Sequence, residues 1–439
     1  MNIAPVFDFS ALDDKVPLHK GQAEIEIKGQ VYQGECEVFF NYLPHTSIDI
    51  SGKFNGVPFN DSVSAMTDPS RFTSLMIDGK KIEGFALGTG GSHPHDGIIC
   101  VDWCSSSEPI CIIGDDSTLI KKVIFHLFNF KDFGRVGNLP GQLVNISQIS
   151  LNSDEWKVRV ESLEITPKNK EFLKTKGGNR ITHVGTIEKN DGSLFTGEQA
   201  DQFLEYLNYF FTFANGYWCN PVCPVGFDEN DNRVWASWSS PMEPYIEPLS
   251  WFAPRYKDQL EELFPLFIKK IQNEEWSKAL SDVISWYHEA NNAKRGIPGC
   301  IIMAQAAIER LSFEYAVKYK KLLTVKGFKE LWASDKLRLL FSSLNIPIDI
   351  PNEDQVLKTI ANQHNLGSAP HAITEIRNSL VHPEHKKQGQ FTEAYFETWD
   401  LFLWYLEIGI LAVCGYSGTY RNRLILGRPI NQVDPVPYI

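Results

Sequence analysis

The hydrophobic pattern changes its period once along the 439-residue chain, and this change constrains the fold more than any other feature. Across residues 1–190, apolar and polar residues tend to alternate, which is the period of a half-buried β-strand. Residues 241–254 hold four prolines and should form a stiff connection, and beyond them apolar residues recur with the helical period. The sequence therefore predicts an α+β fold, with a β-rich N-terminal domain, residues 1–250, and an all-α helical-bundle domain, residues 251–439.

Individual strands can be placed within the first part. Alternation at Ala23–Ile27 and at Trp156–Val160 predicts two of them. The run 123–130 is apolar enough for a central strand, and the aromatic-rich segment 216–240 should return to the sheet as a hairpin or a long loop. Asparagine-glycine and aspartate-glycine pairs between these segments predict turns.

Helices can be placed in the same way. Thr196 and Gln199 have the spacing of a capping box that begins a helix, and Asn215-Gly216 should end it. This is the single helix expected before the prolines. The expected helices after them lie near 257–273, 275–294, 299–321, 327–344, 353–364, 369–382 and 392–414. The last is apolar on more than one face, so it should be covered on most sides by its bundle, alone or together with a second subunit.

The short helix near 369–382 carries the residues with the clearest chemical capability. Ile373, Ile376 and Leu380 follow one another at i, i+3 and i+7, so they form the apolar stripe that packs into a bundle. Ser368 should cap this helix, with Pro370 tolerated in its first turn. Pro383 disfavours helical geometry at the residue before it, so the helix should stop there.

Three polar side chains stand at the end of this helix. Arg377 lies at the edge of the apolar stripe, where a guanidinium is costly unless an anion meets it. Asn378 and His382 are neighbours at i and i+4. An imidazole can accept and return protons near neutral pH, and a guanidinium can hold two phosphate oxygens. This set suits attack of an RNA 2′-hydroxyl on its own phosphate; on spacing alone, a surface arginine and a structural histidine are the alternative.

The segment Arg377–His382 resembles the R-x4-6-H signature of HEPN-type ribonucleases: an arginine, a polar residue, three further residues and a histidine. Two other segments resemble the Apea-like HEPN subgroup of prokaryotic defence proteins. One is the helix MAQAAIERLSFEY, residues 303–315, and the other is CGYSGTYRNRL, residues 414–424, which follows a long apolar helix. The resemblance covers the chain from about 268 to 430.

The resemblance implies an up-down helical bundle, a homodimer that brings two such motifs into one cleft, and metal-independent endoribonuclease activity without a cofactor. Members often act as toxins or antiphage effectors on tRNA or other RNA. It implies that Arg377 binds and stabilises the phosphate and that His382 is the acid and base. Asn378 would orient the imidazole or the substrate. Lys386 and Lys387 follow the motif directly and are candidate RNA-binding residues.

The N-terminal part resembles, by its position, the β-rich domains that precede Apea-like HEPN modules. Such a domain would sense a phage-derived trigger or restrain the nuclease. Two other classes of function stay open: a non-catalytic RNA-binding or protein-interaction adaptor, and a glycan-binding β domain in residues 1–250. Loss of RNA affinity without any cleavage would favour the adaptor, and saccharide binding would favour the glycan-binding domain.

Charge and hydropathy limit the choice of partners. A net charge of -12 argues against non-specific nucleic-acid binding, although a local basic cleft can occur on an acidic protein. No apolar run is long enough to span a membrane and the N-terminus has no signal-peptide pattern, so we expect a cytoplasmic protein without a membrane partner. A cluster of cations could guide a phosphate chain: Lys318, Lys320, Lys321, Lys326, Lys329, Lys336 and Arg338.

Metal chemistry has little support in the sequence. None of the eight cysteines has the paired C-x2-C spacing of a structural zinc site. His93-Pro94-His95-Asp96 offers two histidines but no third ligand at a fixed spacing, so a turn is the expected structure. The chain also lacks the serine-hydrolase G-x-S-x-G and the zincin H-E-x-x-H motifs. We therefore expect neither a metal nor a cofactor.

Overall fold

The computed structural model describes most of the chain and divides it into two compact units. The β unit comprises Met1–Asn129, Leu163–Leu204 and Pro221–Tyr245, and the helical unit comprises Phe130–Ser162, Glu205–Asn220 and Ile246–Ile439. Each unit gathers three separate segments of the chain, so the two units do not test the predicted domain boundary after residue 250. That boundary stays a prediction. The described residues are 3–9, 15–42, 45–68, 70, 72–89, 93–133, 137–139, 142–144, 148–247, 249–382, 384, 386–425, 427 and 432–439.

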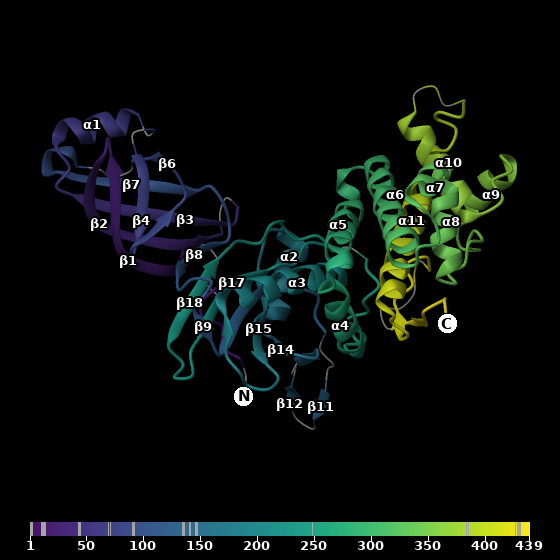
Figure 1. Ribbon diagram of the computed structural model, residues 1–439, viewed down its shortest axis with the longest axis horizontal. Coiled ribbons are helices and arrows are strands. Elements are labelled where there is room, and N and C mark those ends of the chain that lie inside the picture. The colour runs from purple at the N-terminus through teal and green to yellow at the C-terminus, as the bar shows by residue number, and fades with distance from the viewer. Residues whose placement is uncertain are drawn as a thin grey trace. The chain divides into compact units, whose positions relative to one another are not determined.

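The first sheet of the β unit is antiparallel and follows the predicted alternation. Ala23, Ile25 and Ile27 are buried, and the residues between them face away from the core. Contacts between β4 and β6 bring the two ends of the sheet together, so it curls around its core (Figure 1). The strand order is β5-β4-β1-β2-β3-β7-β6. The strands are β1 (Val16–Ile27), β2 (Gln30–Asn41), β3 (Ser47–Asn55), β4 (Phe72–Ile77), β5 (Lys80–Ile82), β6 (Gly84–Gly88) and β7 (Ile98–Ser105).

The second set of strands in the β unit confirms two predictions. The run expected as a central strand forms β10 (Lys122–Phe128), which pairs with β15 (Ile181–Lys189) on one side and β17 (Pro221–Phe227) on the other. The aromatic-rich segment forms a hairpin of β17 and β18 (Arg233–Trp238). Within the β unit these strands pair side by side in the order β15-β10-β17-β18-β8, where β8 is Ile110–Ile113.

Two helices in the N-terminal part contradict the prediction of a single helix there. They are α1 (Phe59–Thr67) and α2 (Thr166–Lys176). Neither begins with a side-chain cap, and α2 has low overall hydrophobicity and no clear apolar stripe. The pattern rule depends on such a stripe, so it missed α2, whereas α1 is only nine residues long and has no cap to mark its start. The third helix, α3 (Gly197–Asn215), confirms its predicted capping box: the Thr196 amide donates to the Gln199 side chain at 3.0 Å.

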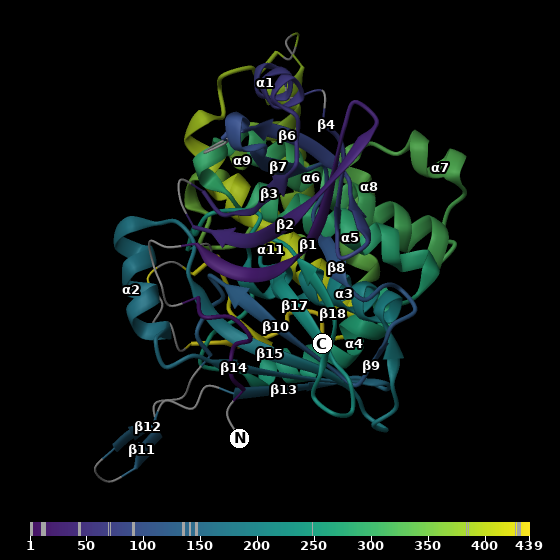
Figure 2. The ribbon, with the colours of Figure 1, turned by 90° about the vertical axis from the view of Figure 1, so that its left-hand side faces the viewer.

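The helical unit is an α-helical bundle with short strands added, which confirms the all-α C-terminal part of the predicted α+β fold (Figures 1 and 2). The helix expected at 327–344 is divided at Leu331 and Trp332, whose backbones are extended. The helix expected at 299–321 ends in a π-helical turn, Glu314–Tyr319. The helices are α4 (Asp258–Ile271), α5 (Glu274–Ala290), α6 (Ile297–Phe313), α7 (Val325–Glu330), α8 (Ala333–Ser343), α9 (Gln355–Gln363), α10 (Ala369–Val381) and α11 (Tyr395–Cys414).

Helix α11 is the centre of the helical unit. It is buried along almost its whole length and packs against α4, α5, α6, α9 and α10 (Figure 1). The chain's own helices therefore cover the apolar faces for which the sequence pattern had left a second subunit open. Among the described residues, no helix is long and apolar enough to cross a bilayer.

Candidate functional site

The motif helix α10 is fixed at its N-terminal end by hydrogen bonds and along its length by packing. The Ser368 hydroxyl accepts the backbone amide of His371 at 3.4 Å, which confirms the predicted cap, and it also meets Arg338 Nη2 of α8 at 3.2 Å. Pro370 occupies the first turn as expected. Ile373 and Ile376 are fully buried. These contacts set the helix in register against its neighbours.

Arg377 is half-buried near the other end of α10. Its Nε has no hydrogen-bond partner within the described parts of the chain. Its Nη1 donates to Asn378 Oδ1 at 3.4 Å, which is at the long limit for such a bond. A guanidinium offers five donors in a planar fork. Arg377 therefore keeps donors that no described residue accepts, although its Nε is itself buried.

His382 follows the last residue of α10 and caps it. Its backbone amide donates to the Asn378 carbonyl at 3.0 Å, and its side chain is exposed. The imidazole makes no hydrogen bond to any residue that the structure describes. The amide oxygen of Asn378 meets Arg377 instead, so the predicted orienting contact with the imidazole is not formed in this single chain. The predicted role of Pro383 lies outside the described residues.

The helix geometry separates the two main groups within one chain. Arg377 and His382 are five residues apart, which corresponds to about 140° around a helix axis. They therefore stand on two flanks of the same helix end.

The two lysines after the motif differ in their surroundings. Lys386 is exposed, whereas Lys387 is half-buried and its Nζ lies 2.9 Å from Glu375 Oε1 on α10. This ion pair offsets the charge of Lys387. Lys386 is therefore the better placed of the two to meet a phosphate.

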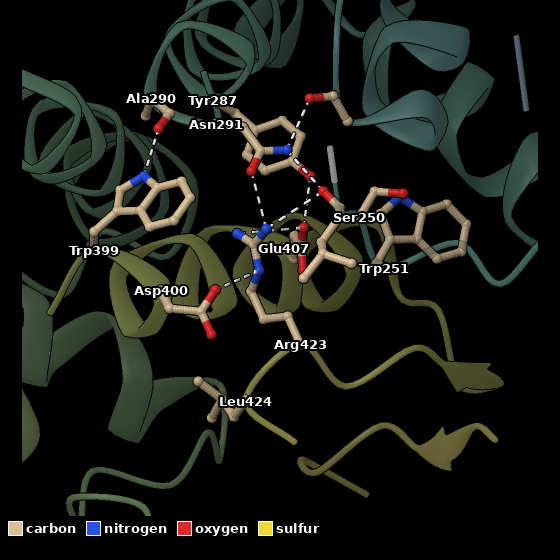
Figure 3. Close-up of polar contacts among 12 residues, drawn as sticks. Ser250, Trp251, Tyr287, Ala290, Asn291, Trp399, Asp400, Glu407, Arg423 and Leu424 are labelled. Atoms are coloured by element: carbon tan, nitrogen blue, oxygen red, sulfur yellow. Dashed lines mark hydrogen bonds and ion pairs between the residues drawn. The ribbon is translucent and has the colours of Figure 1, made fainter. Parts of the chain in front are cut away.

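A second polar cluster in the helical unit is deeply buried. Arg423 lies 3.2 Å from Asp400 Oδ1 through Nε and donates from Nη2 to Asn291 Oδ1 at 2.9 Å (Figure 3). Glu407 lies 3.8 Å from Arg423 Nη1 and accepts the Tyr287 hydroxyl at 2.6 Å. Burial raises the pKa of both carboxyls, and the positive charge of Arg423 opposes that rise.

This buried cluster holds the C-terminal tail against α5 and α11. Arg423 is only 2% exposed and Glu407 is fully buried, so a polymeric substrate has no access to them. The sequence predicted no role for these residues. The available signal was Glu407 itself, because an acid within an apolar helix needs a buried partner.

The helical unit also has an open pocket of about 670 Å³. Ser368, Lys358 and Trp404 are among its lining residues, whereas Arg377 and His382 are not. The pocket therefore belongs to the N-terminal end of α10, away from the motif.

The segment His93–Asp96 of the β unit, whose two histidines raised the question of a metal site, forms a turn. Pro94–Asp96 forms a 3-10 turn, as expected, and the His95 ring lies 4.7 Å from the ring of Phe59. All eight cysteines are free. Within the described ranges, no three His, Cys, Asp or Glu side chains come together as a metal ion requires.

Comparison with known proteins finds similarity along most of the chain. Residues 115–248 match the YopA central domain, and residues 273–433 match the YopA C-terminal domain. The chain is similar to a prophage protein. That relative is the SPbeta prophage-derived uncharacterized protein YopA of Bacillus subtilis (strain 168), 25% identical over 423 residues, which is 94% of this chain and 92% of that protein. No solved structure matches the chain. The C-terminal match includes α10 and its motif.

Proposed function

We propose that this chain is a metal-independent endoribonuclease of the HEPN type that acts in the cytoplasm in antiphage defence, by abortive infection. Its substrate would be tRNA or another cellular RNA. One observation carries the proposal: the same helix end presents, on different flanks, a half-buried guanidinium with an unpartnered Nε and an exposed imidazole. The prophage origin of a relative agrees with a role in conflicts between phage and host.

In this proposal the chemistry needs only Arg377, His382 and the RNA. An imidazole removes the proton of a ribose 2′-hydroxyl, and the oxygen attacks the adjacent phosphorus. The bond from phosphorus to the 5′-oxygen breaks, and that oxygen takes a proton from an imidazolium. Arg377 holds the non-bridging oxygens, on which charge accumulates. The products carry a 2′,3′-cyclic phosphate and a 5′-hydroxyl.

A homodimer completes the proposed site. Because one chain presents Arg377 and His382 on different flanks of α10, two facing copies can surround a phosphate with two guanidinium groups and two imidazoles. One imidazole then acts as the base and the other as the acid. The exposed Lys386 of each copy would meet flanking phosphates.

The test is expression of the wild-type chain in bacterial cells with and without phage, followed by sequencing of RNA 5′ ends. Wild type should give new 5′-hydroxyl ends on infection, and His382→Ala should give none. His371→Ala is a matched control, because His371 lies on the same helix at the end away from the motif. Equal cleavage by wild type and His382→Ala would overturn the proposal.

The alternative is an adaptor that binds RNA or another protein without cutting. One observation favours it: no described residue orients the imidazole of His382. In that case Arg377→Ala would weaken RNA binding, and no RNA would be cleaved with or without phage. The β unit would then sense a phage product, a role that either function can use.

A further inference from the structure

One segment of the helical unit, residues 318–332, concentrates positive charge on an acidic protein. Five of its lysines are exposed, and no acidic residue occurs before Glu330. None of the five makes an ion pair with a described residue. Their charges are therefore available to an anionic partner. We call the segment the lysine-tryptophan surface; its exposed lysines are Lys318, Lys320, Lys321, Lys326 and Lys329.

The same surface exposes large apolar side chains. Trp332 is 80% exposed, and Tyr319, Leu322 and Val325 are each 45–49% exposed. Val325 and Lys329 are neighbours at i and i+4 on α7, and Trp332 follows the helix two residues after its end. Large apolar groups gathered in this way mark an interaction site.

The segment is held in place from its other side. Phe328 is buried against Ala316 and Val317, and Leu323 and Leu331 pack on the same small cluster. The Thr324 hydroxyl caps α7 by accepting the Gly327 amide at 3.1 Å. Figure 2 shows α7 at the margin of the helical unit. The exposed side chains are thus presented by an anchored element, and the half-exposed Tyr319 ring also packs against Trp276, with ring centroids 5.7 Å apart.

We propose that the lysine-tryptophan surface docks on an anionic lipid bilayer. Clustered lysines are attracted to the negative headgroups, while tryptophan, tyrosine and aliphatic side chains enter the interface between headgroups and acyl chains. Single-stranded RNA is the other polyanion to consider, and it binds through phosphates and stacking on aromatic rings. Bases of RNA can stack on Trp332 and Tyr319, but such stacking gives no role to the aliphatic Leu322 and Val325. All four side chains can enter the apolar part of a bilayer interface, so the residue types favour the bilayer.

This docking is independent of the proposed nuclease chemistry. The sequence led us to expect no membrane partner, because it has no spanning run and no signal-peptide pattern. The proposed surface contact departs from that expectation and requires neither feature. Docking would restrict the protein to the membrane surface, where an infecting phage delivers its genome. The cleavage motif need not be active for the docking to occur.

The test is co-sedimentation of the full-length protein with phosphatidylcholine vesicles, with and without phosphatidylserine. The protein should sediment only with the anionic vesicles and less at high salt. The variant with Lys321→Gln, Lys326→Gln and Lys329→Gln should bind about 100-fold more weakly, because each lysine near the surface contributes about a fivefold step in affinity. Trp332→Ala should weaken binding by about tenfold.

The matched control replaces three exposed lysines on α2, where no large apolar side chain is exposed: Lys168→Gln, Lys174→Gln and Lys176→Gln. It should bind vesicles as wild type does. Equal losses in both triple variants, or no sedimentation with anionic vesicles at low salt, would overturn the proposal. So would loss of affinity for a single-stranded RNA oligonucleotide in the Trp332→Ala variant with vesicle binding unchanged, which would assign the surface to RNA. None of these measurements depends on cleavage.

Discussion

Arg423 shows how one buried residue decides the stability of the C-terminal tail. Its guanidinium meets two buried carboxylates, Asp400 and Glu407. Removing it leaves both carboxylates buried without the guanidinium that pairs with them. Arg423→Leu should therefore lower the free energy of unfolding by about 3–5 kcal/mol, measured by urea denaturation. Arg255→Leu, at an exposed arginine, should change it by less than about 0.5 kcal/mol.

A double variant distinguishes charge from packing at this site. If the unpaired charge causes the loss, Glu407→Gln should restore part of the stability of Arg423→Leu. If the double variant is less stable by the sum of the two single losses, the electrostatic account is wrong.

Asp354 gives a residue-scale prediction that depends on pH. Burial, together with the nearby Glu397 and Asp400, raises its pKa from 3.8 to about 8. Between these two values the folded protein holds a proton that the unfolded chain releases, so this group lowers stability as pH rises. Below 3.8 both states are protonated and the group has no effect.

Asp354→Asn removes this ionisation and leaves a side chain of the same shape. Its Oδ2 has no hydrogen-bond partner among the described residues, so no such bond is lost there. The variant should be more stable than wild type by about 2 kcal/mol at pH 8, and the gain should shrink toward pH 4. Thermal unfolding across this range measures the difference. Asp349→Asn, an exposed neighbour, should show no such trend.

At the scale of one element, Ser368 links the stability of α10 to the geometry of the site. The hydroxyl accepts the His371 amide and also meets Arg338 of α8. Ser368→Ala should cost about 1 kcal/mol of unfolding free energy, and Ser368→Asn should recover most of it. Ser342→Ala, at an exposed position of α8, is the control. An unchanged unfolding midpoint in Ser368→Ala would contradict a stabilising role for the cap.

The elements that the sequence predicted well are those with a local signal. The capping box at Thr196, the cap at Ser368, the apolar stripes of α4, α5 and α9, and the alternation in β1 all depend on neighbouring residues. The missed helices α1 and α2 both lack a side-chain cap, α1 is short and α2 has no clear apolar stripe, and the break at Trp332 occurs without proline or glycine. Their structure depends on tertiary packing, which a single-sequence pattern does not contain.

In the candidate site, too, the features with a local sequence signal were predictable and the side-chain contacts were not. The positions of Ser368, the apolar stripe and the helix end were predictable, because helix periodicity and capping determine them. The contact of Asn378 with Arg377 instead of His382, and the pairing of Lys387 with Glu375, depend on side-chain rotamers. Arg423 contacts Asn291, 132 residues before it in the sequence, as well as Asp400 and Glu407 on α11. Sequence spacing could not bring these residues together.

At the scale of the whole molecule, the account requires two copies of the chain. Helix α11 provides no open apolar face for this contact, since its own unit buries it. The dimer would instead form around the C-terminal end of α10. Analytical ultracentrifugation should give twice the mass of the chain. Replacing the exposed Lys386 with glutamate should shift this equilibrium far less than replacing half-buried Leu380 with glutamate. A monomer at every concentration would contradict the shared-cleft mechanism.

The chemistry of the RNA ends tests the central claim most directly. Purified protein would be incubated with tRNA and a chelator, and the ends of any fragments would be identified by mass spectrometry. The account predicts 2′,3′-cyclic phosphate and 5′-hydroxyl ends, unaffected by the chelator and absent with Arg377→Ala or His382→Ala. Fragments that end in 3′-hydroxyl and 5′-phosphate and disappear with the chelator, or equal cleavage by both variants, would contradict it.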